Sequence, residues 1–381
     1  MALLVYLILI VLVLAGCAGV PAQKAERLDQ AMYRWQDESL SLIQKYQTNP
    51  LRASRVLAAL HGALLEVRDV SASESQPCRI RQLNATAAQV LEYFFPLETP
   101  GRLQALAEIA EQGGSDCKLD RVQSVVHSVR ARAQADGAFP PRRIRTNPSP
   151  FVGEWRPTAP IFMNTPAEPF AGEWRLYFSD NPAVYPIKGP LSPNSTAYLD
   201  ATHEVLNIKQ TLSPAQQSAA DDWHLDAGSV TPPGVWNQRL RAMLRTSGEQ
   251  VDEIRLFAAA NKAMYDAMVV CWHYKYTYWT ERPITAAERL GLGSFTPRLV
   301  TPPFPSYPSG HSTVSGAVAK VIAAYVPSLE AEADRLARQA ADSRLWGGIH
   351  FTFDNEDGLV LGQRVGAAAI RAMPPVPRPS R

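Results

Sequence analysis

Residues that could perform chemistry on an anion are concentrated in three short stretches of the C-terminal half. They are Lys275 with Arg282; Ser309, Gly310 and His311; and Arg344 with His350 and Asp354. Together they supply a lysine, two arginines, two histidines, a serine hydroxyl and an aspartate. Such a set can hold a tetrahedral oxyanion and exchange protons at its centre. Phosphate and vanadate are the candidates, because both pass through a five-coordinate geometry whose charge is spread over equatorial oxygens.

The first stretch pairs two different cations. Lys275 and Arg282 lie seven residues apart, which would place them two turns apart on one face of a helix. A guanidinium fork binds two oxygens of an anion, whereas an ammonium acts as a point charge. Five aromatic residues lie between positions 272 and 279, which predicts a partly buried stretch where unpaired cations would be costly. Taken alone, this spacing is more often a solvated helix face.

The second stretch precedes a helix that we expect to start near Ser312. A glycine lets the backbone approach an anion, and the N–H groups of a helix N-terminus point toward it. Ser309 adds a hydroxyl donor, and His311 can transfer a proton near neutral pH. The alternative is a serine N-cap followed by a surface histidine. A serine-hydrolase site is disfavoured, because no G-x-S-x-G motif surrounds Ser309.

The third stretch couples a histidine to a carboxylate. His350 and Asp354 are four residues apart, close enough on a helix for the carboxylate to hold one imidazole nitrogen and leave the other free. Arg344 would lie on another face of a continuous helix, but Gly347-Gly348 can break the helix and turn both side chains inward. The acidic run at 354–358 does not match the ligand spacing of a calcium-binding EF-hand.

The elements that must position these residues are helices, and we predict an all-α fold. Apolar residues recur at helical spacing over residues 25–134, which predicts helices there. Residues 139–193 are rich in proline, which predicts an irregular segment. This segment contains the motif F-x-G-E-W-R twice, and we expect the two copies to be similar loop anchors. Further helices are predicted near 213–217 and over 250–280, 313–325, 331–346 and 356–372. The predicted organisation is a signal peptide at 1–17, a helical region at 18–138, an irregular connector at 139–193 and a catalytic domain at 194–381.

The N-terminus predicts export. Residues 3–14 are apolar and end in Leu-Ala-Gly-Cys, which resembles the lipobox of bacterial lipoproteins and makes Cys17 the lipidation site. The first six residues lack Lys and Arg, and the alternative is a buried N-terminal helix. Ala18-Gly19 carry no acidic retention signal, which favours an outer-membrane anchor facing the periplasm. Cys78 and Cys117 could form a disulfide there, whereas Cys271 is expected to be a core thiol.

The three motifs together resemble a known superfamily, which joins type 2 phosphatidic acid phosphatases, bacterial acid phosphatases and vanadium-dependent haloperoxidases. Its signature is Lys-x6-Arg-Pro, then Pro-Ser-Gly-His, then Ser-Arg-x5-His-x3-Asp, and the chain matches all three parts in order. The resemblance implies two four-helix bundles with the anion between helices. It implies the following roles: oxyanion contacts from Lys275, Arg282, Ser309, Gly310 and Arg344; an acid/base at His311; a vanadium ligand or phosphoryl acceptor at His350; and Asp354 as its orienting partner.

Further segments favour the haloperoxidase branch. Residues 223–237 resemble the haloperoxidase segment whose aspartate partners the acid/base histidine, and Asp226 is the candidate here. Trp272 and Phe304 occupy positions where similar chloroperoxidases have Trp and Phe. Thr280-Glu281 depart from the usual Phe-Trp before the arginine, and an acidic neighbour could weaken the hold of Arg282 on an anion.

We therefore predict a vanadate-dependent haloperoxidase-like enzyme that uses hydrogen peroxide and halide, anchored to a membrane by its lipid. The first alternative is a periplasmic acid phosphatase that cleaves phosphate esters through a phosphohistidine and needs no cofactor. The second is an inactive lipoprotein that only binds an oxyanion. A formal net charge of +2 argues against a nucleic-acid partner, and the sequence gives no indication of oligomeric state.

Overall fold

The computed structural model describes residues 27–109, 117–139 and 152–376, and this part of the chain is built from helices. It contains thirteen α-helices and three 3-10 helices, and its only strand-like pairings are two isolated bridges. The all-α prediction is confirmed. Residues 1–26, which include the whole predicted signal peptide, the lipobox and Cys17, lie outside the described residues.

Four helices form the N-terminal bundle, with a short fifth helix beside them. They are α1 (Leu28–Lys45), α2 (Pro50–Val70), α3 (Gln76–Phe94) and α5 (Asp120–Ala135), joined by α4 (Arg102–Ile109). The start of α2 is well defined, because Asn49 accepts a hydrogen bond from the Arg52 N–H and Pro50 occupies the first helical position. Helix α2 is buried along most of its length and forms the centre of this bundle.

Four further helices form the C-terminal bundle, which carries the three motifs. They are α9 (Glu253–Tyr278), α11 (Gly310–Tyr325), α12 (Glu330–Trp346) and α13 (Thr352–Ala372). Helices α11 and α13 pack almost backbone to backbone. A Cβ at Gly316 would lie 2.4 Å from the Leu359 carbonyl oxygen, and a Cβ at Gly362 would lie 2.0 Å from that of Thr313. This close packing brings the second and third motifs together.

The two bundles share one hydrophobic core. Helix α2 packs along α9, and a continuous set of buried apolar side chains extends from α1 to α13. Helices α6 (Thr196–Thr211), α7 (Pro214–Asp222) and α10 (Pro283–Arg289) lie around the motif-bearing end of the C-terminal bundle. Helix α8 (Thr231–Ser247) contacts both bundles, and the 3-10 helix η3 (Pro327–Leu329) connects α11 to α12. The predicted capping of α7 is present, with Ser213 as N-cap, Pro214 at the first position and Gln216 completing a capping box. His203 lies on α6, where it is exposed.

The described part of the proline-rich connector contains no α-helix, only the 3-10 helices η1 (Ala171–Glu173) and η2 (Pro182–Val184). Both copies of the repeated motif hold it against α9 and its C-terminal end. In the first copy the Trp155 N–H donates to the Trp279 carbonyl at 2.6 Å. In the second, a Cβ at Gly172 would lie 2.4 Å from the His273 backbone, so only glycine allows this approach. The connector is thereby fixed beside the first motif.

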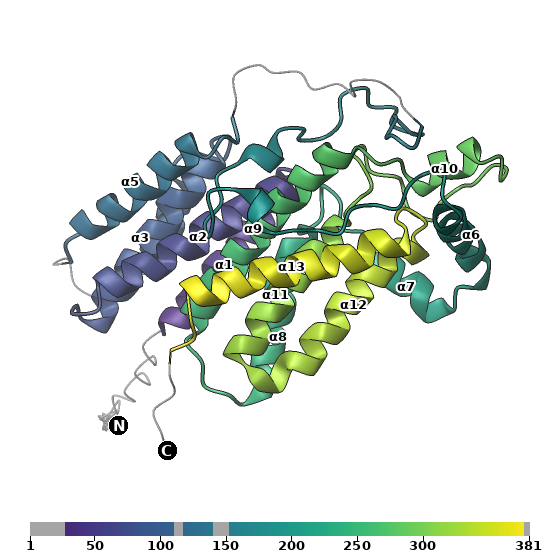
Figure 1. Ribbon diagram of the computed structural model, residues 1–381. Coiled ribbons are helices and arrows are strands. Elements are labelled where there is room, and N and C mark those ends of the chain that lie inside the picture. Colours follow the sequence, from purple (N-terminus) through teal and green to yellow (C-terminus); the bar gives the residue numbers. More distant parts are fainter. Residues whose placement is uncertain (1–26, 110–116, 140–151, 377–381) are drawn as a thin grey trace, which may run out of the picture.

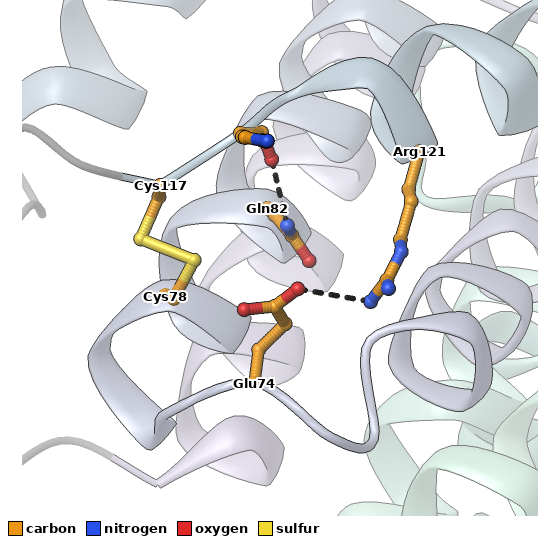
Figure 2. The surroundings of a disulfide bond; sticks show 6 residues. Glu74, Cys78, Gln82, Cys117 and Arg121 are labelled. Atoms are coloured by element: carbon orange, nitrogen blue, oxygen red, sulfur yellow. Dashed lines mark hydrogen bonds and ion pairs between the residues drawn. A yellow bond between two sulfur atoms is a disulfide. The ribbon is translucent and has the colours of Figure 1, made fainter.

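Cys78 and Cys117 form a disulfide that ties the start of α3 to the segment preceding α5 (Figure 2). Two polar contacts reinforce this junction: the Gln82 amide donates to the Lys118 carbonyl at 2.8 Å, and Glu74 pairs with Arg121 at 3.0 Å. Cys271 is a buried free thiol, as expected. Among the described helices, none combines the length and apolarity that a bilayer crossing requires.

Candidate oxyanion site

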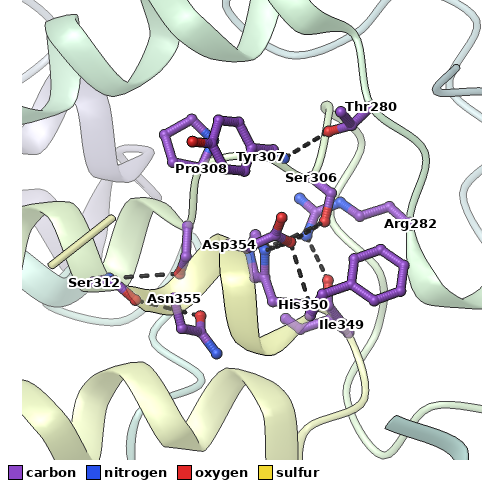
Figure 3. Close-up of polar contacts among 12 residues, drawn as sticks. Thr280, Arg282, Ser306, Tyr307, Pro308, Ser312, Ile349, His350, Asp354 and Asn355 are labelled. Atoms are coloured by element: carbon purple, nitrogen blue, oxygen red, sulfur yellow. Dashed lines mark hydrogen bonds and ion pairs between the residues drawn. The ribbon is translucent and has the colours of Figure 1, made fainter. Parts of the chain in front are cut away.

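The three motifs meet at one end of the C-terminal bundle, beside a cleft of about 90 Å³ (Figure 3). Gly310, His311, Arg344 and His350 line the cleft directly. The other predicted oxyanion contacts, Lys275, Arg282 and Ser309, lie behind this lining and are fully buried. The convergence that the sequence motifs predicted is therefore present, although not every member faces the open space.

Lys275 lies in the last turn of α9 with its ammonium enclosed by backbone carbonyls. Its Nζ donates to the carbonyls of Pro305 and Ser306 at 2.8 and 2.7 Å, which leaves one N–H of a protonated amine available. The same atom lies 5.2 Å from the centre of the Phe304 ring and 5.6 Å from that of Trp272. Burial lowers the pKa of Lys275, and the nearby charge of Arg282 acts in the same direction. An anion at this site would reverse that effect.

Arg282 does not share a helix with Lys275, contrary to the sequence prediction. Helix α9 ends at Tyr278, where Trp279 adopts a left-handed conformation with φ of 52°, and Arg282 is the N-cap of α10. Its Nε donates to the Phe304 carbonyl at 3.0 Å, and its Nη1 donates to the Ile349 carbonyl at 2.7 Å. Its Nη2 is buried without a hydrogen-bond partner among the described residues.

This unpartnered nitrogen is informative, because a buried donor without an acceptor is costly. Burial lowers the pKa of Arg282 to about 10, which still leaves the guanidinium charged at neutral pH. The side chain therefore presents a charged donor that an anion would satisfy.

His350 and Asp354 form the expected pair, but not on one helix. His350 precedes α13, Phe351 is its N-cap, and Asp354 occupies the third helical position. The His350 Nδ1 lies 2.8 Å from Asp354 Oδ2, and its Nε2 lies 3.0 Å from the Nη1 of Arg282. Because a guanidinium can only donate, Nε2 must carry a lone pair and the proton must lie on Nδ1.

The electrostatics agree with this tautomer. Burial lowers the pKa of His350 well below its ordinary value, and the charges of Arg282 and Lys275 lower it further. Burial raises the pKa of Asp354, opposed by a hydrogen bond from Ser306 and by the charges of Lys275 and Arg282. His350 is thus neutral and offers a free nitrogen lone pair next to charged donors.

Ser306 is a site residue that the sequence motifs did not identify. Its hydroxyl donates to Asp354 Oδ2 at 2.5 Å and lies 3.4 Å from His350 Nδ1 (Figure 3). Its own N–H donates to the Thr280 carbonyl at 3.0 Å, which ties the second motif to the segment between α9 and α10. Ser306 lies outside the Pro-Ser-Gly-His motif, and no spacing signal in the sequence marks it.

Helix α11 begins at Gly310, two residues earlier than predicted. Ser309 is the N-cap, and its N–H donates to the Asp354 carbonyl at 3.0 Å, which joins the second motif to α13. A Cβ at Gly310 would lie 3.3 Å from Cζ3 of Trp272, so the helix N-terminus fits closely against the indole.

His311, in the first turn of α11, points into the cleft. Its Nε2 is buried without a hydrogen-bond partner among the described residues. Burial lowers the pKa of His311 well below its ordinary value, Arg344 lowers it further, and a hydrogen bond with the Trp223 backbone opposes both. The imidazole is neutral and can accept a proton.

Arg344 enters the cleft from the last turn of α12, and Gly347-Gly348 end that helix as predicted. Gly348 has φ of 75°, a conformation that side chains disfavour. The Arg344 guanidinium donates from Nε to the Ser343 hydroxyl at 3.0 Å and from Nη2 to the Ala220 carbonyl at 3.1 Å. Burial lowers the pKa of Arg344 to about 9, and the negative charge of Asp226 opposes this shift.

Asp226 lies at the cleft but is not hydrogen-bonded to His311 in the described structure. Its carboxylate instead pairs with His224 Nε2 at 2.9 Å and is more than half exposed. The sequence analysis had given His224 no role, yet its side chain lines the same cleft. His311 is held by the backbone of Trp223 rather than by the predicted carboxylate.

The acidic neighbour of Arg282 does not interfere with it. Glu281 is buried and accepts hydrogen bonds from the Tyr198 hydroxyl at 3.0 Å and from Arg289 Nη2 at 2.6 Å. The expected weakening of Arg282 by Glu281 is therefore absent, because the carboxylate is satisfied by partners on α6 and α10.

The remaining wall of the cleft is apolar. The rings of Trp272 and Phe304 are in contact, with their centroids 4.9 Å apart. Met268, Val300 and Ile349 extend this surface. One side of the cleft therefore offers charged and hydrogen-bonding groups, and the other excludes water from them, which strengthens electrostatic interactions at the site.

Comparison with known proteins agrees with this geometry. Residues 255–336 and 331–376 match the family described as VCPO second helical-bundle domain. The chain is 30% identical over 140 residues to vanadium chloroperoxidase from Curvularia inaequalis, a match that covers 30% of this chain and 23% of the fungal protein. This chain thus spans about a quarter of that relative's length.

Two solved structures share the fold over most of the chain. A bacterial vanadium-dependent iodoperoxidase superposes with a TM-score of 0.75 and 21% identity, covering 91% of this chain and 97% of that one. A holo-type bacterial vanadium-dependent chloroperoxidase gives a TM-score of 0.67 and 15% identity, covering 86% and 91%.

The fold is therefore that of the vanadium haloperoxidases, and residues 255–376 form a helical-bundle domain of the vanadium chloroperoxidase type. The match over residues 255–376 agrees with the resemblance to the vanadium-dependent haloperoxidases that the three motifs indicated.

Proposed function

We propose that this protein is a vanadate-dependent haloperoxidase, which uses hydrogen peroxide to oxidise a halide ion. The observation that carries the proposal is the pairing of two complementary groups at one point. His350 Nε2 carries a lone pair whose present partner is the Nη1 of Arg282, and the Nη2 of Arg282 is buried without a partner among the described residues. A metal-centred oxyanion satisfies both groups at once, because it offers a centre for the nitrogen and oxygens for the guanidinium.

The residues present fit vanadate. Lys275, Arg282 and Arg344 would neutralise its charge, Gly310 lines the cleft at the N-terminus of α11, and His350 would ligate the metal. Bound vanadate supplies Lewis-acid activation of hydrogen peroxide.

The protein's own groups have separate tasks in the reaction. Asp354 and Ser306 keep the proton of His350 on Nδ1, so that Nε2 stays available. His311 accepts a proton from the incoming peroxide and returns it to the departing oxygen. The Trp272–Phe304 wall excludes water from the charged groups. The overall change is balanced: hydrogen peroxide, one halide ion and one proton give hypohalous acid and water.

The family model and the sequence relative favour a peroxidase over a phosphatase, because both are of the vanadium chloroperoxidase type. In the phosphatase alternative the same Nε2 of His350 would attack phosphorus.

One experiment distinguishes these functions. Protein freed of metal is supplied with orthovanadate, and bromination of a phenol dye is compared with hydrolysis of p-nitrophenyl phosphate. We expect bromination that depends on vanadate and peroxide. Hydrolysis that vanadate inhibits, without bromination, would identify a phosphatase, and vanadate binding without either activity would identify an inactive binding protein.

We further propose that the protein is an exported lipoprotein anchored through Cys17. The Cys78–Cys117 disulfide supports an oxidising compartment. Incorporation of labelled palmitate that is lost in Cys17→Ser would support the anchor, and unchanged labelling of that variant would rule out Cys17 as the modified residue.

A further inference from the structure

The loop between α7 and α8 is held in an unusual backbone conformation next to the cleft. Leu225 and Thr231 have φ of 49° and 66°, although neither is glycine, and Gly228 has φ of 91°. Thr231 is a β-branched residue and is fully buried. Such conformations persist only where the surroundings enforce them, and they are concentrated at functional sites.

The effect of this loop is to place two histidines in one cleft. The Trp223 backbone is hydrogen-bonded to His311, and the next residue, His224, is turned back onto Asp226 with 2.9 Å between Nε2 and Oδ2. The turn passes through Leu225, so its left-handed conformation is what brings Asp226 to His224. The His224 side chain is 39% exposed, although the Nε2 that faces Asp226 is buried.

His311 has no comparable access of its own to a proton donor. Its Nε2 is buried and lacks a hydrogen-bond partner in the part of the chain that the structure describes. The proposed reaction consumes one proton in each turnover beyond those that hydrogen peroxide brings, and this proton must reach the cleft from solvent.

We propose that His224, held by Asp226, relays protons between solvent and His311. This inference rests on the proposed haloperoxidase function and assigns its proton supply. In this proposal His224 acts through His311 and does not contact the halide or the peroxide. In each cycle the imidazolium of His224 passes its proton inward to His311, directly or through water, and the resulting neutral His224 takes a proton from solvent.

The charges around the two imidazoles set the direction of this transfer. The hydrogen bond to Asp226 raises the pKa of His224, and the negative charge of Asp221, which is paired with Arg298, raises this pKa further. Burial and the positive charge of Arg344 lower the pKa of His224 and so oppose these effects. The pKa of His311 is lowered by burial and by Arg344. The proton therefore resides on His224 in the resting site. An anion that neutralises Arg344 favours its transfer to His311.

The test compares the wild-type protein with His224→Gln and with His203→Gln, a matched control on the exposed face of α6. In His224→Gln we expect the halogenation rate at pH 8 to fall by about tenfold or more, less than the loss of the acid/base residue itself would cause, while the vanadate affinity stays within about twofold. Imidazole added to the buffer should restore much of the rate. His203→Gln should match the wild-type protein.

A second readout does not depend on turnover. NMR titration of the histidine rings in vanadate-free protein should give His224 a pKa above the ordinary value, and Asp226→Asn should lower it. The relay is overturned if the pH–rate profile of His224→Gln superimposes on that of the wild-type protein, or if His224 titrates below its ordinary value. Absence of halogenation by the wild-type protein would instead refute the proposed function, and the relay with it.

Discussion

Replacing Arg282 with methionine should have different effects on the stability of the anion-free protein and on its affinity for an anion. The pKa of Arg282 falls from 12.5 to about 10, so its charged form is disfavoured in the folded protein by about 3 kcal/mol. Arg282→Met removes this cost, but it leaves the carbonyls of Phe304 and Ile349 without their donors. Each lost donor costs about 1–3 kcal/mol. The net change in the free energy of unfolding without anion should therefore lie between a gain of about 1 kcal/mol and a loss of about 3 kcal/mol.

Anion binding should respond much more strongly. Removing one partner of a buried, hydrogen-bonded charge pair costs about 2–5 kcal/mol, which raises the Kd by about 30-fold or more. Orthovanadate at about 100 times the wild-type Kd should stabilise the wild-type protein by about 2.7 kcal/mol. At the same concentration the gain for Arg282→Met should be under about 1 kcal/mol.

The assay is thermal unfolding with increasing orthovanadate, repeated with phosphate. For a chain of this length the wild-type Tm should rise by about 3 °C, and the rise in Arg282→Met should be less than half of that. Arg335→Met is the control, because Arg335 forms an exposed ion pair with Glu332 outside the site. An anion-dependent rise in Arg282→Met equal to that of the wild-type protein would refute the assignment of Arg282 to the anion.

Three further predictions follow from single contacts. Ser306→Ala removes a donor to Asp354 and should weaken vanadate binding by about tenfold, measured by isothermal titration; unchanged affinity would contradict the role of this hydroxyl. Burial raises the pKa of Asp266 from 3.8 to about 7, so the folded protein holds this proton more tightly than the unfolded chain. The free energy of unfolding should therefore fall by at most about 4 kcal/mol through this group as the pH rises from about 4 to 7. Urea unfolding of Asp266→Asn over the same pH range should not show this decrease. Gly362→Ala places a Cβ 2.0 Å from the Thr313 carbonyl and should lower stability by about 1–3 kcal/mol in the same assay, whereas a neutral effect would mean that α11 and α13 separate easily.

The helices and the gathering of the motifs could be predicted from the sequence, because both depend on local patterns. Apolar spacing, the serine cap at 213 and the glycines at 347–348 fixed the boundaries of several helices to within a few residues. The pairing of His350 with Asp354 was also predicted, although the reason given was a shared helix. In the structure the two are joined across the N-terminus of α13 instead.

The features that were missed depend on backbone conformations without a sequence signal. Trp279 ends α9 in a left-handed conformation that is usually taken by glycine, so the separation of Lys275 from Arg282 could not be anticipated. The partner of Asp226 was misjudged for a similar reason, because the left-handed turn at Leu225 brings the carboxylate to His224. Ser306 was overlooked because its role depends on α13 packing against the loop before α11.

The central claim is that His350 and the three buried cations hold a single oxyanion. A crystal structure of the protein soaked in orthovanadate tests it most directly. We expect vanadium bonded to His350 Nε2, its oxygens contacted by Arg282 and Arg344, and the present contact between Arg282 Nη1 and His350 Nε2 broken. An anion bound elsewhere, with that contact intact, would contradict the account.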